Sequence, residues 1–179
     1  HFQARVIRSS GESRVYEEKI YFSKGTMKPI VLTEEPSKGY SFNGAPVLND
    51  GIKGNGNYKT GRWLGFQGKD IVATFDLKEA TEISKIRFAT NVVKGDWIMD
   101  ARQAYVSVSD DGKTFREVGK EELPEMQMAD KDGLFVHEID FTSVKAKYVQ
   151  VTIKKVNLPS WHGGAGNPAF IFVDEIEIL

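Results

Sequence analysis

The sequence predicts an all-β protein built mainly as an antiparallel β-sandwich, and three observations lead to this. Nearly every patterned segment alternates apolar and polar residues with a period of two, the period of a half-buried strand. These segments are short and are separated by clusters of Gly, Pro and Asn. The chain has 179 residues, 40% of them hydrophobic, which is enough for one sizeable core.

The first predicted unit is a β-hairpin within "FQARVIRSSGESRVYEEKIYF", followed by the Gly- and Pro-containing join "SKGTMKP". Two strands cannot form a core of their own. We therefore expect residues 1–28 to be the C-terminal strands of an upstream β-domain, and residues 29–179 to form the main domain. The alternative is that the hairpin adds to the main sheet.

The main domain contains five strand patterns. In "LFVHEIDF" (134–141), His137 shares a face with Phe135 and Ile139, so we expect a core or edge histidine. In "AYVSVSDDGKTFREV", two short strands flank an Asp-Gly turn, which is typical of a hairpin. The segment "GKEELPEMQMADKDG" (119–133) is predicted to be non-strand, and its Pro124 disfavours a long helix. The strand patterns are 71–77, 104–118, 134–141, 146–156 and 169–179.

Composition excludes several classes of function. The net charge is −1, from 24 basic and 25 acidic residues, and a nucleic-acid binder usually carries a basic excess. No stretch approaches the ~20 apolar residues of a membrane span, and "HFQARVIRSS" lacks the apolar core of a signal peptide. Cysteine is absent, so neither a disulfide nor a thiolate metal site is possible.

No catalytic motif is present either. The sequence contains no Gly-x-Ser-x-Gly elbow, no His-Glu-x-x-His and no dinucleotide-binding fingerprint. The acidic pairs Asp110-Asp111 and Glu121-Glu122 fall in a predicted turn and a polar segment, where we expect them to be solvated. We therefore expect this chain not to be an enzyme.

The stretch "VLNDGIKGNGNYKTGRW" (47–63) is rich in glycine and offers backbone carbonyls, the Asp50 carboxylate and the Thr60 hydroxyl. It is not an EF-hand, because the third and fifth positions counted from Asp50 are Ile52 and Gly54. It is not a phosphate-binding P-loop, because it lacks Gly-Lys-Ser/Thr. In the last strand pattern Glu175 shares a face with Val173, so we expect Glu175 beside the apolar core, where a carboxylate needs a partner.

Several fragments together resemble the discoidin, or coagulation-factor type C, family. They are "LNDG", "WLGFQGKDIVATFDL", "AYVSVSDDGKTFREV", "AKYVQVTIKKV" and "FVDEIEIL", in the family's order over about residues 30–179. Animal members usually carry a cysteine pair that this chain lacks, which favours the bacterial carbohydrate-binding branch. "LPSWHGGAGNPAFIFVDEI" resembles the C-terminal module of bacterial β-N-acetylhexosaminidases and related glycoside hydrolases. The implied fold is a jelly-roll sandwich like that of galactose-binding domains.

The resemblance also implies a structural Ca²⁺ held between the 47–63 loop and a glutamate near the C-terminus, which is Glu175 here. Calcium takes six to eight oxygen ligands from carboxylates and carbonyls. The alternative is an ordinary Asp-Gly turn and an exposed glutamate at a strand end. The expected ligands are the side chains of Asp50, Thr60 and Glu175 and the carbonyls of Val47, Ile52 and Asp174.

Sugar recognition needs an aromatic ring that stacks on a pyranose, with polar groups around it. Trp161 and His162 lie in a glycine-rich loop, and Trp97 lies in "KGDWIMDAR". The alternative for both tryptophans is that each plugs an end of the sandwich, and His162 could equally cap loop carbonyls. The family places Trp63 in the core, beneath the loop. The polar groups expected at the sugar are Asn167, Arg62, Asp100 and Arg102.

We therefore expect a non-catalytic, calcium-stabilised carbohydrate-binding module from a secreted, periplasmic or cell-surface bacterial glycoside hydrolase of the β-N-acetylhexosaminidase type. Its expected partners are a galactose- or N-acetylhexosamine-type glycan and the parent catalytic domain, with no nucleic acid and no membrane. Two alternatives are a structural module that packs on its parent without binding sugar, and a lipid-surface binder. The lipid binder would need apolar spikes in adjacent loops, and Trp97-Ile98-Met99 is the only such run.

Overall fold

A computed structural model describes residues 2–4, 7–8, 10–12, 15–18 and 22–179 of the protein. Eight of the described strands join in one antiparallel sheet, in the order β6-β11-β7-β10-β8-β9, with β5 and β12 also paired to β7. No helix in this part of the chain is long and apolar enough to cross a membrane. The elements are β5 (Ile30–Leu32), η1 (Ala45–Leu48), β6 (Leu64–Gln67), β7 (Ile71–Val92), η2 (Lys94–Asp96), β8 (Gln103–Ser109), β9 (Arg116–Glu122), β10 (Gly133–Ile153), β11 (Phe170–Val173) and β12 (Glu177–Ile178), where η1 and η2 are 3₁₀ turns.

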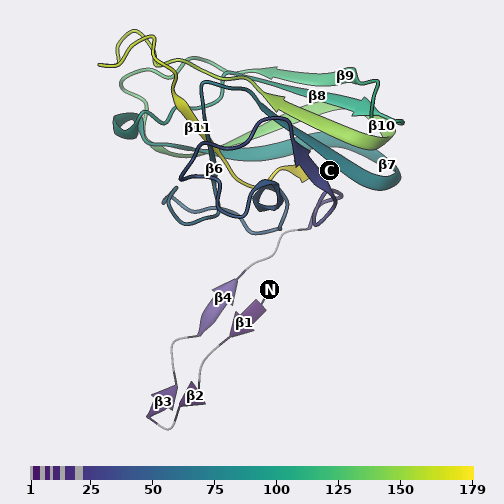
Figure 1. Cartoon of the computed structure of the whole chain (residues 1–179), viewed down its shortest axis with the longest axis horizontal. Coiled ribbons are helices and arrows are strands. Elements are labelled where there is room, and N and C mark those ends of the chain that lie inside the picture. Colours follow the sequence, from purple (N-terminus) through teal and green to yellow (C-terminus); the bar gives the residue numbers. More distant parts are fainter. Residues whose placement is uncertain (1, 5–6, 9, 13–14, 19–21) are drawn as a thin grey trace.

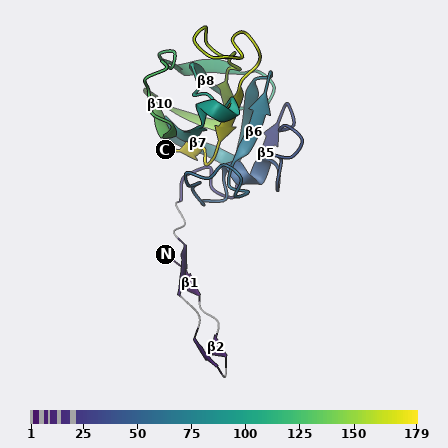
Figure 2. The same cartoon turned by 90° about the vertical axis from the view of Figure 1, so that its left-hand side faces the viewer.

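Two long strands, β7 and β10, fold this sheet into two layers (Figures 1 and 2). The start of β7 pairs with β5 and with the end of β10. The end of β10 in turn pairs with β8, and β8 pairs with β9. The end of β7 pairs with the start of β10 and with β11 and β12. The ladder between them shifts near Asp140 and Ala146, and Lys78 adopts a left-handed φ of 73°. The predicted antiparallel sandwich is confirmed.

The predicted alternation is confirmed along the start of β7 and the end of β10. Along the start of β7 every second side chain is buried, from Ile71 to Leu77, and along the end of β10 so are Val149, Val151 and Ile153. The predicted hairpin of residues 104–118 is formed by β8 and β9. His137 is a core histidine, 7% exposed, as expected.

Several predicted boundaries differ from the structure. The strand patterns 134–141 and 146–156 belong to one strand, β10 (Gly133–Ile153), which ends three residues before the second pattern does. The segment 119–133 was expected to be non-strand, but β9 continues through Glu122. The strand predicted over 71–77 extends to Val92. The last strand, expected over 169–179, is divided into β11 and β12, because the N–H of Ile176 leaves the ladder and donates to the Leu48 carbonyl of η1 (2.7 Å).

The N-terminal hairpin is formed by β1 (Phe2–Ala4) paired with β4 (Tyr16–Glu18), and β2 (Ile7–Arg8) paired with β3 (Gly11–Glu12). The described strands of this hairpin make their own two-stranded sheets and stand apart from the sandwich (Figure 1), so they do not extend the main sheet. Its segments 5–6, 9, 13–14 and 19–21 lie outside the described residues.

Residues just before the predicted boundary at residue 28 contact the sandwich. The Lys24 N–H donates to the Ile178 carbonyl (2.9 Å), and the Asn49 side-chain amide donates to the carbonyls of Gly25 and Lys28 (both 2.8 Å). Residues 24–28 therefore pack on the sandwich. That the hairpin belongs to an upstream domain stays a prediction.

Trp63 is fully buried, as expected, and explains one glycine of the 47–63 loop. Its Nε1 donates to the Asn55 carbonyl (3.0 Å), so the loop backbone lies against the indole. A Cβ added at Gly54 would come within 2.2 Å of Trp63 Cε2. Only glycine permits this approach.

We expect Gly54→Ala to lower the free energy of unfolding by about 1–3 kcal/mol, the usual cost of overpacking. Gly56→Ala is the matched control, because nothing lies within 4 Å of its added Cβ. Urea denaturation at constant m-value measures both. Equal midpoints for the two variants would show that the loop does not rest on the indole.

Candidate functional site

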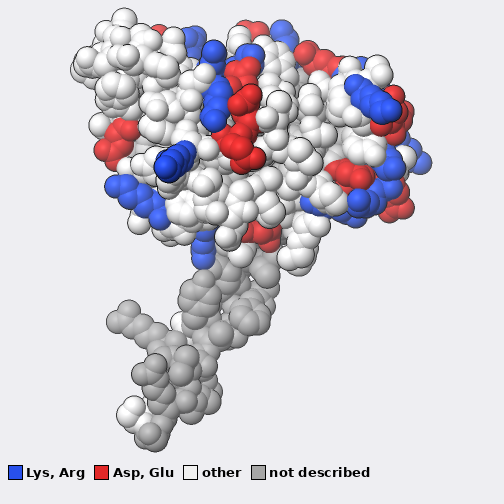
Figure 3. All heavy atoms as spheres, viewed as in Figure 1, with Lys and Arg blue, Asp and Glu red and all other residues white. Residues whose placement is uncertain are grey.

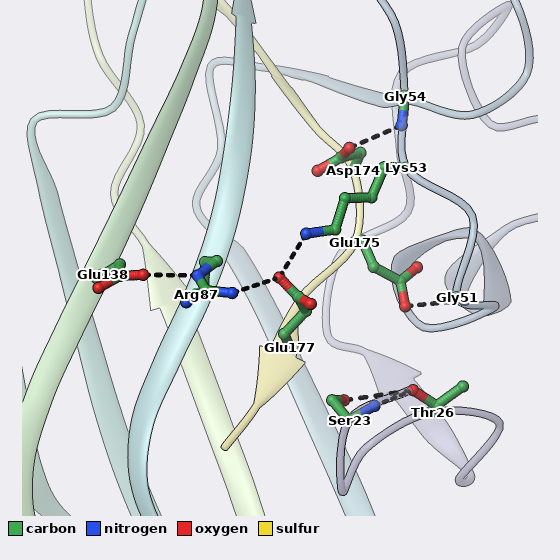
Figure 4. Close-up of polar contacts among 10 residues, drawn as sticks. All are labelled: Ser23, Thr26, Gly51, Lys53, Gly54, Arg87, Glu138, Asp174, Glu175 and Glu177. Carbon is green, nitrogen blue, oxygen red and sulfur yellow. Dashed lines mark hydrogen bonds and ion pairs between the residues drawn. The ribbon is translucent and has the colours of Figure 1, made fainter. Parts of the chain in front are cut away.

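Two adjacent carboxylates face the 47–63 loop from the segment between β11 and β12 (Figure 4). Asp174 and Glu175 are each only 2% exposed. Glu175 Oε1 accepts the Gly51 N–H and Asp174 Oδ2 accepts the Gly54 N–H, both at 2.8 Å. Glu175 is buried as expected, so the alternative of an exposed strand-end glutamate is wrong.

The charge at this site is incompletely balanced. Burial raises the pKa of Asp174 to about 7. Burial, together with the neighbouring charges of Asp50 and Asp174, raises the pKa of Glu175 to about 8. Glu175 Oε2 is buried and has no hydrogen-bond partner within the described chain. Glu177 is better compensated, because Lys53 Nζ lies 2.9 Å from its Oε2 (Figure 4).

The residues expected to bind calcium are only partly brought together. Asp50 and Ile52 flank Gly51 beside Glu175, and Asp50 Oδ1 accepts the Ile52 N–H (2.8 Å). Val47 lies in η1. Thr60 is exposed, and its hydroxyl donates to the Asn57 carbonyl (3.1 Å), so no described hydrogen bond joins it to either carboxylate.

The donor set fits a hard cation in one respect and is sparse in another. The unpartnered Glu175 Oε2 is a buried oxygen that a cation would satisfy. No group of three or more acidic, His or Cys side chains in the described residues could hold a metal by itself. A calcium ion here would need loop carbonyls, as the sequence indicates. The side chain of Asp174, for which only the carbonyl was expected to contribute, also faces the loop.

A second group of residues lies at the end of the sandwich where the β10–β11 loop projects (Figures 1 and 2). Trp97 follows η2 with a left-handed φ of 65° and is 38% exposed. Its backbone is held in place, because the Trp97 N–H donates to Lys94 and its carbonyl accepts the Phe170 N–H (2.8 Å). A Cβ added at Gly164 would lie 2.8 Å from the Trp97 ring, so the loop supports the ring closely.

Trp161 has a different environment from the one expected for a sugar-stacking residue. Its ring is partly buried against the main core, and Nε1 donates to the Met126 carbonyl (2.9 Å). Trp161 thus anchors the loop, and the structure favours the plugging alternative for it. Trp97, rather than Trp161, is the exposed indole.

The other expected sugar-binding residues divide into three places. His162 Nδ1 accepts the Gly164 N–H, so its Nε2 proton is donated to the Lys94 carbonyl (both 3.0 Å), which makes His162 a cap of loop groups. Asn167 is exposed in the same loop, and its amide donates to Gly164 (3.0 Å). These two lie with Trp97. Arg62 stays in the 47–63 loop, partly exposed.

The described contacts of Asp100 and Arg102 do not involve Trp97. Asp100 is 9% exposed, and its Oδ1 contacts His137 Nε2 (2.8 Å) and accepts the Thr90 hydroxyl (2.5 Å), so its polar contacts are internal. Arg102 pairs with Glu125 (3.1 Å) at the rim of a groove. The structure therefore does not gather the expected residues into one site.

Sequence reasoning missed Tyr58 and Asp96. The Tyr58 hydroxyl donates to Asp96 Oδ2 (2.6 Å), which joins the 47–63 loop to η2 next to Trp97. The Tyr58 ring packs on Phe172 (4.8 Å between centroids), and burial raises the pKa of its hydroxyl. One signal in the sequence was Tyr58 itself. An aromatic residue within a run of Gly, Asn and Lys indicates packing against another part of the protein.

We expect Tyr58→Phe to leave the fold intact but to loosen η2 and the Trp97 ring. The measurement is ¹⁹F NMR of 5-fluorotryptophan-labelled protein, with the Trp97 resonance assigned from Trp97→Phe. Tyr40→Phe is the control, because Tyr40 packs on the same Phe172 (4.9 Å) from another segment. An unchanged Trp97 resonance in Tyr58→Phe, matching the control, would contradict this role.

Charges of both signs are interspersed on the face of the molecule seen in Figure 3. A nucleic-acid-binding face would carry a basic patch or stripe. This face therefore gives no support to phosphate-backbone binding, in line with the balanced composition.

Comparison with known proteins identifies related folds. The F5/8 type C domain model matches residues 34–170. A chitosan-binding module of a chitosanase/glucanase from Paenibacillus sp. IK-5 has a TM-score of 0.57 at 14% identity, over 89% of this chain and 99% of that module. A fucose-binding module of Streptococcus pneumoniae has a TM-score of 0.54 at 18% identity, over 89% and 95%.

A Clostridium perfringens module, CpGH89CBM32-5, was solved with GalNAc-β-1,3-galactose. Its TM-score is 0.53 at 19% identity, over 84% of this chain and 94% of that one. No curated protein sequence matches. At these identities the likeness establishes the fold, which is that of carbohydrate-binding modules.

Proposed function

The chain belongs to the F5/8 type C domain family, and we propose that it is a non-catalytic glycan-binding module stabilised by calcium. The observation that carries this proposal is Trp97. It is an exposed indole in a fixed backbone conformation, at the end of the sandwich where the loops meet. Modules of this fold from glycoside hydrolases bind sugars.

Trp97 suits the apolar face of a pyranose. An aromatic ring contributes a large apolar surface, and one already held in place loses little conformational entropy on binding. The His162 ring packs against Trp97 (6.2 Å between centroids), and the side chains of Asp96 and Asn167 offer polar groups for sugar hydroxyls. A galactose- or N-acetylhexosamine-type sugar is the proposed ligand.

A calcium ion would lie between the 47–63 loop and the Asp174–Glu175 pair. The side chains of Asp50 and Glu175, with the carbonyls of Val47, Ile52 and Asp174, would hold it, and Thr60 would join them only if its hydroxyl left the Asn57 carbonyl. The ion would supply positive charge to two buried carboxylates. The chain's own residues then do the positioning, because Gly51 and Gly54 tie the loop to the acids and Tyr58 ties it to η2.

We further propose that the module serves a secreted, periplasmic or cell-surface bacterial glycoside hydrolase of the β-N-acetylhexosaminidase type. A tethered binding module raises the effective concentration of the glycan at the catalytic domain. It adds no chemistry of its own.

Of the two alternative functions, the structure bears on the lipid-surface binder. The lipid-binding alternative requires an apolar spike, but Ile98 and Met99 are buried (1% and 3% exposed), so Trp97 stands alone. That observation disfavours a lipid surface. A purely structural module is left to the binding experiment.

Trp97→Ala should weaken glycan binding at least about tenfold, the equivalent of 1.4 kcal/mol, without lowering the melting temperature. Affinity is measured on glycans selected from an array of galactose- and N-acetylhexosamine-terminated ligands. Leu134→Ala, at another exposed apolar residue (47%), is the control. Full affinity in Trp97→Ala would move the site elsewhere. A blank array with liposome binding would support the lipid alternative.

Calcium should stabilise the protein more at pH 8 than at pH 5. Both acids have folded-state pKa values above their ordinary 3.8 and 4.5. The folded state then binds protons more tightly than the unfolded state, so the stability of chelator-treated protein falls as pH rises from about 4 to about 8. At about 100 Kd of free calcium the gain is about 2.7 kcal/mol, or about 5–10 °C in melting temperature.

Glu175→Gln is the matched variant for this experiment. It removes one of the two buried acids, so both the fall with pH and the response to calcium should shrink. Identical melting curves of the wild-type protein in chelator and in calcium at pH 8 would rule out the metal.

A further inference from the structure

A polar groove is lined in part by the β10–β11 loop, and Trp97 is not among the residues that line it. It encloses about 840 Å³ between this loop, the segment that follows β10 and the ends of β8 and β9. Small-molecule sites span about 300–1,000 Å³, so the groove has room for more than one sugar ring. Its polar side chains include Arg102, Glu122, Glu125, Lys155, Asn157 and Ser160.

Hydrogen bonds within the protein hold the walls of the groove in place before any ligand binds. The Lys154 N–H donates to the Gln103 carbonyl (2.9 Å), and the Leu123 N–H donates to the Arg102 carbonyl (2.8 Å). Asp70 accepts the Lys155 N–H (2.9 Å) and also pairs with the Lys154 ammonium. A preformed groove lowers the ordering cost of binding.

The chemistry of the lining favours a neutral, hydroxyl-rich ligand. Guanidinium, ammonium and amide donors occur together with carboxylate acceptors in the lining, and each sugar hydroxyl can use either kind. Arg102 and Glu125 form an ion pair at the groove and are both about half exposed (50% and 43%), so their charges cancel locally. The lining therefore offers no surface of a single charge sign that would select a phosphate or uronate chain, or a polyamine.

A small recess next to the groove has room for one hydroxyl group. It measures about 10 Å³, close to the ~10–15 Å³ that one water needs. Asp100 and Asn157 line it with Met99 and Met126. A ring substituent could enter this recess while the chain lies in the groove.

The groove is lined by residues 158–160 and 165–166 of the β10–β11 loop and not by Trp97. Trp161 Nε1 donates to the Met126 carbonyl (2.9 Å), so this residue ties the loop to the segment after β9. A ligand in the groove therefore does not need to touch Trp97.

We propose that this groove is a second glycan-binding site, which takes a neutral oligosaccharide of two or more sugars independently of Trp97. The inference rests on the proposed function only for the class of ligand. Two sites on one module would let it hold a branched glycan, or two chains, with more avidity than either site alone.

The experiment is an NMR titration of the full chain with triacetylchitotriose and lacto-N-tetraose, which are neutral, and with chitotriose and trimannuronate, which are charged. A neutral probe should shift the amides of residues 122–125 and 154–160 saturably, and Trp97→Ala should leave these shifts in place. The double variant Arg102→Ala/Glu125→Ala should weaken groove binding at least fivefold. Asp110→Ala/Lys113→Ala, at the far turn of the same hairpin, is the charge-matched control and should not.

Each other outcome overturns the proposal. If only residues 93–99 shift, the groove is not a site but the proposed function stands. If the groove shifts only with a charged probe, the neutral-ligand assignment is wrong. If no amide in either region responds to any probe, both proposals are wrong. Loss of the groove shifts in Trp97→Ala would show one site rather than two.

Discussion

The hydrogen bonds from the glycine-rich loop to two buried carboxylates are the contacts on which the functional end of the molecule depends. Gly51 donates to Glu175 and Gly54 donates to Asp174, across more than 100 residues of sequence. They close the loop over Trp63 and hold it against the second layer. Burying two acids is costly, and a cation held at the loop carbonyls would offset that cost.

The same loop links the acids to the aromatic end. Tyr58 continues it to Asp96 and η2, and η2 presents Trp97. Trp161 ties the β10–β11 loop, which lines the polar groove, to Met126. The sandwich supports the 47–63 loop, η2 and the β10–β11 loop. The contacts of these three segments position the candidate functional residues at its end.

Sequence reasoning succeeded where the pattern was local. Period-two alternation placed Ile71, Phe75 and Val151 in the core, because a strand's side chains point alternately to its two faces. It failed where a strand is interrupted. Alternation set Asp174 and Glu175 on opposite faces, but Ile176 leaves the ladder to donate to Leu48, and both acids then turn toward the loop.

The sequence by itself determined the sandwich, its family and the burial of Glu175 and Trp63, because periodicity and short motifs are properties of the neighbouring residues. Only the tertiary structure decided which tryptophan is exposed. Trp97 and Trp161 both lie in polar, irregular segments, and their exposure depends on Met126 and Gly164, which are distant in sequence. The pairing of Arg102 with Glu125 at the groove was decided in the same way, because the two residues are brought together by the fold and not by strand alternation.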